Sequence, residues 1–356
     1  MNIDAYKDNI KEYINFSHEN PNLELEAILK PTYSEPINVD DFTRLMRRLK
    51  PLSIKQTHIE TLDIIYEYQP GKQSNIRVSI IGKQNIKKYC ETNRIDTIDV
   101  RYVKFLRKQR IKVASDSGNQ VYLKPIDIDE YNIRINLKSE DYLSINHQNV
   151  IDILDNKTWG NKRKFFRYKT RYSFLLPEKQ FTCDLTIVKS SNVKIIDSDQ
   201  KKIRKFIYTK TLQESNIFKN EPNYEIELEY IGNSSKPVNN IETVMNNMFK
   251  YIGFILQSHQ KSFYLCNKQD RKKFRDEYTS LLGLSKYKGF QGPNSITIET
   301  KHIQKRSYIE YKNELVNIRR NYSVTDKADG ERNCLVILED GSCLLYTSDA
   351  ADEEDS

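Results

Sequence analysis

The sequence lacks the features that mark disulfide-rich, zinc-binding and membrane proteins. Its 356 residues include five scattered cysteines, with no Cys-x-x-Cys pair and no His/Cys cluster, at Cys90, Cys183, Cys266, Cys334 and Cys343. This spacing suggests neither a zinc site nor a disulfide framework, so a reducing compartment is expected. No apolar run approaches the ~20 residues of a membrane span, and the first residues lack a signal peptide's basic and apolar regions. We expect an intracellular protein without a membrane partner.

Charge and length then narrow the function class. A formal net charge of +8 and a pI near 8.9 favour a polyanionic partner such as nucleic acid or a nucleotide, although a solvated lysine-rich surface is the alternative. At roughly 100–200 residues per domain, the length predicts two or three domains.

Alternation of apolar and polar residues dominates the chain from Leu23 to Ile231. Because successive side chains of a strand point to opposite faces, this pattern predicts half-buried strands. The clearest segments are Asn75–Ile81, Lys104–Lys112, Asn132–Lys138, Phe165–Phe174, Cys183–Val188 and Tyr224–Ile231. Many short strands with little helix imply a barrel or a sandwich. Helices are expected on the flank, at Tyr6–Phe16 and at Asp40–Leu49, where Asp40 or Asp41 caps the start.

A Gly, Ser, Pro and Asn-rich segment, 232–240, predicts a linker between domains 1–235 and 236–342. Helical spacing of apolar residues follows at Ile241–Gln257, and a second helix is expected at Asp270–Leu282. The segment from Cys343 reads as one frame of a transposase-type sequencing adapter, so residues 343–356 are expected to be an artefact that interrupts the second domain. An ordinary acidic tail is the alternative.

Two predicted strands carry glutamates on one face. Glu24 and Glu26 alternate with apolar residues, and a second strand repeats the pattern with Glu225, Glu227 and Glu229. Carboxylates at this spacing lie ~7 Å apart and repel by ~2 kcal/mol per pair, which a divalent cation would relieve. Oxygen ligands suit Mg²⁺ or Mn²⁺. A solvent-facing strand explains one such segment well, but two segments near opposite ends of one domain favour a metal site.

Basic and polar residues line one face of the intervening strands. These faces comprise Arg77 and Ser79; Lys108, Arg110 and Lys112; Arg134, Asn136, Lys138 and Glu140; Arg167, Lys169 and Arg171; and Asp184 with Thr186. A solvated outer face explains any one strand but explains the whole set poorly. A barrel interior lined by cations and carboxylates together would suit a triphosphate, because the cations neutralise phosphate oxygens while the carboxylates hold the metal.

With these motifs, the segment from Leu23 to Ile231 resembles the tunnel-type, metal-dependent RNA triphosphatases of fungal, protozoan and large DNA virus capping enzymes. The resemblance implies a mainly β fold, an antiparallel β-barrel with flanking helices. Ile28 departs from the ExExK motif of the related thiamine-triphosphatase and adenylyl-cyclase branch, which favours the RNA branch.

The resemblance also implies the roles of individual residues. Metal ligands are expected among the five glutamates, with Glu225 and Glu227 preferred to Glu229. Catalytic positions are Arg77, Lys108, Glu140, Lys169, Arg171, Asp184 and Glu227, while Lys104, Arg110 and Lys112 compete with Lys108 for its role. Arg110 and Arg134 are expected to bind substrate. Water would attack the γ-phosphorus in line, with Glu227 orienting it.

A second motif, KxDGxR, stands at Lys327, Asp329, Gly330 and Arg332. It resembles the nucleotide-attachment motif of mRNA guanylyltransferases and of DNA and RNA ligases, and the run Gly289–Ile296 resembles the approach to it in viral capping enzymes. The resemblance implies the start of an α+β nucleotidyltransferase domain that binds GTP and is guanylylated on Lys327. A surface turn is the alternative. Because the motifs that complete the nucleotide pocket do not follow, this guanylyltransferase region is expected to be inactive.

Together the two motifs predict mRNA capping that starts from 5′-triphosphate RNA. Expected partners are a methyltransferase domain or subunit and RNA polymerase, and the expected location is the cytoplasm, a viral factory or a virion. One alternative is a tunnel enzyme for free NTP or polyphosphate fused to a ligase-like domain. Another is a non-catalytic barrel that binds RNA ends.

Overall fold

The computed structural model describes residues 4–31, 36–114, 119–198, 201–232, 240–286, 298–303, 318–319, 322–324 and 333–347. The chain divides into two compact units, Met1–Asn267 and Lys268–Ser356. No helix among the described residues is long and apolar enough to cross a membrane.

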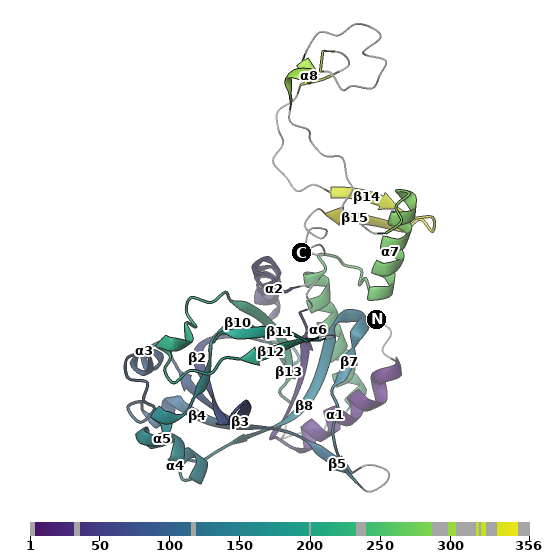
Figure 1. The fold of residues 1–356 in the computed structure, drawn as a ribbon. Coiled ribbons are helices and arrows are strands. Elements are labelled where there is room, and N and C mark those ends of the chain that lie inside the picture. The colour runs from purple at the N-terminus through teal and green to yellow at the C-terminus, as the bar shows by residue number, and fades with distance from the viewer. Residues whose placement is uncertain are drawn as a thin grey trace. The chain divides into compact units, whose positions relative to one another are not determined.

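The first unit is built on a closed antiparallel barrel (Figure 1). In order around the barrel, the eight strands are β1 (Leu23–Leu29), β13 (Asn223–Tyr230), β10 (Phe181–Ser190), β9 (Lys164–Leu175), β2 (Lys55–Gln69), β3 (Lys72–Ile81), β4 (Val103–Arg110) and β8 (Ile133–Tyr142). The pairing of β1 with β8 closes the ring, and the short strand β7 (Ile126–Ile128) adds to β8. The sequence prediction of a mainly β barrel is therefore confirmed, and a two-sheet sandwich is excluded.

Helices cover the outside of the barrel in two groups. The first comprises α1 (Lys7–Glu19), α2 (Val39–Leu52) and α6 (Ile241–His259), and the second α3 (Lys83–Thr92), α4 (Gln148–Leu154) and α5 (Asn156–Asn161). Each group shares a core with the outward side chains of the strands beneath it; Leu25 and Leu228 lie in the first core and Val78 in the second. Because a strand alternates its faces, burying these apolar side chains outside turns the charged ones inward.

Smaller elements complete the chain. Two hairpins extend from the first unit, β5 (Lys112–Ala114) with β6 (Gln120–Tyr122) and β11 (Val193–Ser198) with β12 (Lys201–Phe206). Short 3₁₀ turns occur at Asp4–Tyr6, Val100–Tyr102, Asp129–Tyr131 and Gln213–Ser215.

The structure differs from the sequence predictions at three places in this unit. The cap of α2 is Asn38, whose side chain accepts the backbone N–H of Asp41, instead of Asp40 or Asp41 itself. Strand β4 ends at Arg110, so Lys112 starts the exposed β5 hairpin and leaves the barrel. The compact unit also extends beyond residue 235 to Asn267, because buried Met248 and its neighbours on α6 join the barrel's outer core.

The second unit contains α7 (Lys268–Leu281), α8 (Thr300–Ile303) and the hairpin β14 (Asn333–Ile337) with β15 (Cys343–Thr347). Its small core is formed by Phe274, Tyr278, Val336 and Leu338. The predicted nucleotide-attachment residues Lys327, Asp329, Gly330 and Arg332, and the run 289–296, lie outside the described residues. The adapter origin of residues 343–356 stays a prediction, since a paired strand at its start does not bear on where the sequence came from.

Candidate functional site

The barrel register brings the predicted glutamates of the two acidic strands side by side. Glu26 on β1 lies opposite Glu229 on β13, and Ile28 lies opposite Glu227. On the other side of β13, Glu227 lies opposite Asp184 and Glu225 lies opposite Thr186, both on β10. Because paired residues of adjacent strands share a face, all these polar side chains point into the barrel.

Glu26 is the most deeply buried of the five glutamates, at 5% exposed. Its carboxylate accepts a hydrogen bond from Lys138 at 2.7 Å and another from Asn136 at 3.3 Å, both on β8. Neither β8 residue was predicted to contact a glutamate. The charge of Glu26 is therefore balanced by one lysine in this structure.

Glu24 and Glu140 share Lys108 between them. The Lys108 ammonium donates to Glu24 at 3.0 Å and forms an ion pair with Glu140. Burial raises the pKa of Glu24. Burial also opposes ionisation of Glu140, but hydrogen bonding to Glu24 and the charge of Lys108 outweigh it and lower the Glu140 pKa. Among its competitors, Lys108 is thus the cation that reaches the carboxylates, whereas Lys104 and Arg110 are exposed.

Glu227 and Glu229 have carboxyl groups whose pKa is raised well above the ordinary value. Burial raises the pKa of Glu227 to about 7, with Arg171 opposing and Glu26 adding to the effect. Burial raises the pKa of Glu229 to about 8, and repulsion from Glu24 and Asp184 adds to it. Glu229 also has no ion-pair partner among the described residues. The carboxylates around Glu227 and Glu229 therefore carry more negative charge than the neighbouring cations neutralise.

The opposite wall carries the cations, which are held by further acidic side chains. Arg171 contacts Asp184 at 2.9 Å and Glu227 at 3.2 Å. Lys169 contacts Asp63 at 2.6 Å, and Arg77 reaches the same carboxylate at 3.6 Å. The predicted residues Arg77, Lys169, Arg171 and Asp184 thus form one connected wall.

The sequence interpretation missed one residue of this wall, Asp63, and gave no role to another, Arg167. Asp63 on β2 is fully buried, accepts a 2.6 Å hydrogen bond from Ser79 and binds both Lys169 and Arg77. Arg167 pairs with Glu225 at 2.6 Å. Arg167 had been noted on the basic face but given no role, while Asp63 stands alone among apolar residues and gives no repeated motif.

Arg134 and Arg110 do not join this network. Arg134 makes a two-pronged contact with Asp127 on β7, with both distances 2.8 Å, and Lys30 binds the same carboxylate. Arg110 lies opposite Lys138 in register but is exposed. Their expected role in substrate binding stays a prediction.

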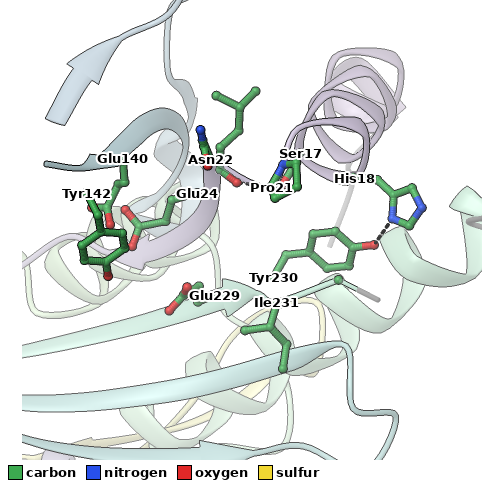
Figure 2. A pocket seen from close by; sticks show the side chains of 12 residues that line it. Ser17, His18, Pro21, Asn22, Glu24, Glu140, Tyr142, Glu229, Tyr230 and Ile231 are labelled. Atoms are coloured by element: carbon green, nitrogen blue, oxygen red, sulfur yellow. Dashed lines mark hydrogen bonds between the residues drawn. The ribbon is translucent and has the colours of Figure 1, made fainter. Parts of the chain in front are cut away.

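A cavity of about 300 Å³ opens at the end of the barrel where β8 and β13 finish (Figure 2). Its lining includes Glu24, Glu140 and Glu229, with Tyr142 and Tyr230 beside them. In the described part of the chain, no group of three or more His, Cys, Asp or Glu side chains is already arranged to hold a metal ion. Two of the cavity carboxylates, Glu24 and Glu140, are instead paired with Lys108.

Comparison with known proteins finds similarity to one viral protein along half of this chain. A probable mRNA-capping enzyme of Acanthamoeba polyphaga mimivirus is 31% identical over 189 residues. This chain is similar to a viral mRNA-capping enzyme. The aligned part covers 53% of this chain but only 13% of the mimivirus protein's length. A scan against known protein families finds no match.

Solved structures of the mimivirus mRNA-capping enzyme are also similar. Its RNA triphosphatase domain is 21% identical, with a TM-score of 0.48, and the match covers 72% of this chain and 99% of that one. A triclinic form of the capping-enzyme triphosphatase is 22% identical, with a TM-score of 0.48, covering 72% of this chain and 98% of that one.

The raised carboxyl pKa values predict how the metal-free protein responds to pH. A carboxyl whose pKa is raised by folding stabilises the fold below its ordinary pKa of 4.5, and that contribution is lost as pH rises through the folded pKa. For Glu227 and Glu229 the loss ends near pH 7 and pH 8. We expect the Tm in EDTA to fall by on the order of 10 °C between pH about 5 and about 8.5.

Thermal melts of wild type and of Glu229→Gln check this expectation. The neutral variant cannot lose a proton from this position, so its Tm should depend less on pH across the same range. If the Tm of both proteins depends equally steeply on pH, the pKa of Glu229 is not raised by burial.

Proposed function

We propose that the barrel is a metal-dependent RNA 5′-triphosphatase, which removes the γ-phosphate of triphosphate-ended RNA and leaves a diphosphate end for capping. The observation that carries the proposal is the closed interior itself, in which the glutamates of β1 and β13 face the cations of β9, β3 and β4. Such a lining suits a polyanion together with a divalent cation. The name of the mimivirus relative supports RNA as the molecule that carries the triphosphate.

We propose that the metal is held by Glu24, Glu26 and Glu229, with Glu227 close by. The donor chemistry fits Mg²⁺ or Mn²⁺, because these ions prefer carboxylate oxygens. Burial, with repulsion from neighbouring carboxylates, raises the pKa of Glu227 and Glu229, and a bound cation would relieve that repulsion. Glu229 lies opposite Glu26 and has no cation partner among the described residues, whereas Glu225 is paired with Arg167. We therefore prefer Glu229 to Glu225, which reverses the order expected from sequence. When bound, the metal would polarise the γ-phosphate oxygens.

The protein's own cations would bind the triphosphate and stabilise the charge that develops on it. Arg171, Lys169, Arg77 and Lys108 reach into the interior from three strands and are held there by carboxylates. Water attacks the γ-phosphorus as the bond to the β-phosphate oxygen breaks, and the diphosphate end of the RNA leaves with the bonding electrons. Glu227, with its pKa near 7, is suited to orient that water and accept its proton.

We propose further that the second unit begins a GTP-dependent guanylyltransferase with Lys327 as its nucleophile. The KxDGxR motif supports this proposal, as does the capping name of the mimivirus relative. A methyltransferase, RNA polymerase and a cytoplasmic viral factory would be the corresponding partners and location.

Release of labelled phosphate tests the triphosphatase directly. The full chain with Mg²⁺ or Mn²⁺ is expected to release γ-phosphate from triphosphate-ended RNA. Free NTP and inorganic tripolyphosphate are assayed in parallel. Release that is insensitive to EDTA would overturn the metal mechanism, and exclusive activity on tripolyphosphate would favour a polyphosphate phosphohydrolase. Binding of RNA without any hydrolysis would favour the non-catalytic barrel.

A further inference from the structure

Tyr142 is an aromatic side chain at the rim of the cavity beside the glutamates. It is the last residue of β8, two positions after Glu140, and so lies on the same inward face. Figure 2 shows its ring beside Glu140 and Glu24, and the ring lines the cavity with Glu229. Nevertheless 67% of Tyr142 is exposed. An aromatic face is thus open to solvent where the barrel interior meets the outside.

Lys104 lies over one face of this ring. It is exposed near the start of β4, and its ammonium lies 5.5 Å from the Tyr142 ring centroid. Its register partner is Ser79, which points into the barrel, so Lys104 belongs to the inner face as well. No carboxylate within the described ranges forms an ion pair with it. The rim therefore combines an open ring with an ammonium that is available to an anion.

The order of groups in the proposed substrate matches this arrangement. An RNA end consists of a triphosphate, then an uncharged nucleoside, then a phosphodiester. If the triphosphate lies among Lys108, Arg171 and Lys169, the nucleoside must lie at a mouth of the barrel. The cavity suits it, because an uncharged nucleoside is not repelled by Glu140, which the proposed metal site does not use and whose oxygens can accept hydrogen bonds from ribose hydroxyls.

We propose that Tyr142 stacks against the 5′-terminal base of the RNA and that Lys104 binds the first phosphodiester. This inference rests on the proposed triphosphatase function and adds to it a subsite for the nucleoside. Stacking on an aromatic ring tolerates every base, which suits an enzyme that must accept transcripts of any sequence. It also gives the barrel a means to prefer RNA ends to inorganic tripolyphosphate.

Three substrates separate the two contacts. Tripolyphosphate has no base, a nucleoside triphosphate has a base but no phosphodiester, and triphosphate-ended RNA has both. Tyr142→Ala is expected to lower kcat/KM for RNA and for nucleoside triphosphate about ten-fold relative to kcat/KM for tripolyphosphate. Tyr142→Phe should keep the wild-type ratio because it keeps the ring. Lys104→Ala should lower the ratio of RNA to nucleoside triphosphate and weaken the salt dependence of RNA binding.

Tyr68→Ala is the matched control, since Tyr68 is an equally exposed tyrosine (69%) on β2 that does not line the cavity. Equal losses on all three substrates in Tyr142→Ala, or an unchanged ratio, would overturn the subsite. If the wild type hydrolyses none of the substrates, the proposed function fails. Fluorescence anisotropy with labelled triphosphate-ended RNA then still decides the inference, because stacking requires Tyr142→Ala to bind more weakly than both wild type and Tyr142→Phe.

Discussion

Glu26→Gln is expected to reduce metal-dependent release of γ-phosphate from triphosphate-ended RNA by at least about a thousand-fold, which corresponds to ~4 kcal/mol of transition-state stabilisation. Glu26 is buried and lies opposite Glu229 at the proposed metal site. Glutamine keeps the side chain's volume and can still accept a hydrogen bond from Asn136, but it removes the negative charge that a hard divalent cation requires. Single-turnover phosphate release at saturating RNA measures the effect.

The control for Glu26→Gln is Glu91→Gln, which makes the same chemical change at an exposed position on α3. It should keep wild-type activity. Circular dichroism should show that both variants remain folded, because Glu26→Gln removes one negative charge from a group of mutually repelling carboxylates. Retention of more than about a tenth of the wild-type rate by Glu26→Gln would rule out Glu26 as a metal ligand.

The alternation of the strands is what made much of the barrel predictable. Period-2 patterns at β1 and β13 indicated correctly which glutamates share a face, because a strand's geometry fixes the side of each residue without knowledge of its neighbours. By the same geometry, Tyr168 and Tyr172 lie on the face of β9 opposite Lys169 and Arg171. Tyr168 accordingly contacts Glu60 and Phe218 on the outside of the sheet.

Pairing between strands could not be predicted in the same way. Which glutamate of β13 lies opposite Glu26 depends on register, and register depends on packing of residues distant in sequence. The sequence prediction that Glu225 is a metal ligand ahead of Glu229 was therefore made without knowledge of the register between β1 and β13. Helix α6 shows the same limit, since its apolar spacing predicts a helix but does not say whether the barrel or a following domain covers it.

Strand β2 illustrates a further limit. It is the longest strand of the barrel, yet its consecutive apolar residues Ile64, Ile65 and Tyr66 blur the alternation that identified the other strands. The inward carboxylate of Asp63 therefore stood in no repeated polar pattern that would have identified it. The pairs Asp63↔Arg167 and Asp63↔Ser79 show that this strand lies between β9 and β3, which carry Lys169 and Arg77.

Asp63→Asn is expected to lower kcat about a hundred-fold, even though Asp63 is proposed as a positioning residue that touches no substrate. Asp63 holds Lys169 at 2.6 Å and Arg77 at 3.6 Å. Burial lowers the pKa of Lys169, and the charge of Asp63 opposes part of that effect. Asparagine removes the opposing charge, so the Lys169 pKa should fall further and its ammonium should lose its proton at a lower pH than in wild type.

The pH profile distinguishes this role from a structural one. The defect of Asp63→Asn should shrink as pH falls, because acid restores the proton on Lys169. Ser79→Ala is the matched comparison, since it removes only the hydroxyl that donates to Asp63 and leaves both ion pairs in place. It should cost no more than a few-fold in kcat, with a wild-type pH profile. If the Asp63→Asn defect is the same at every pH, Asp63 acts through folding and not through the charge of Lys169.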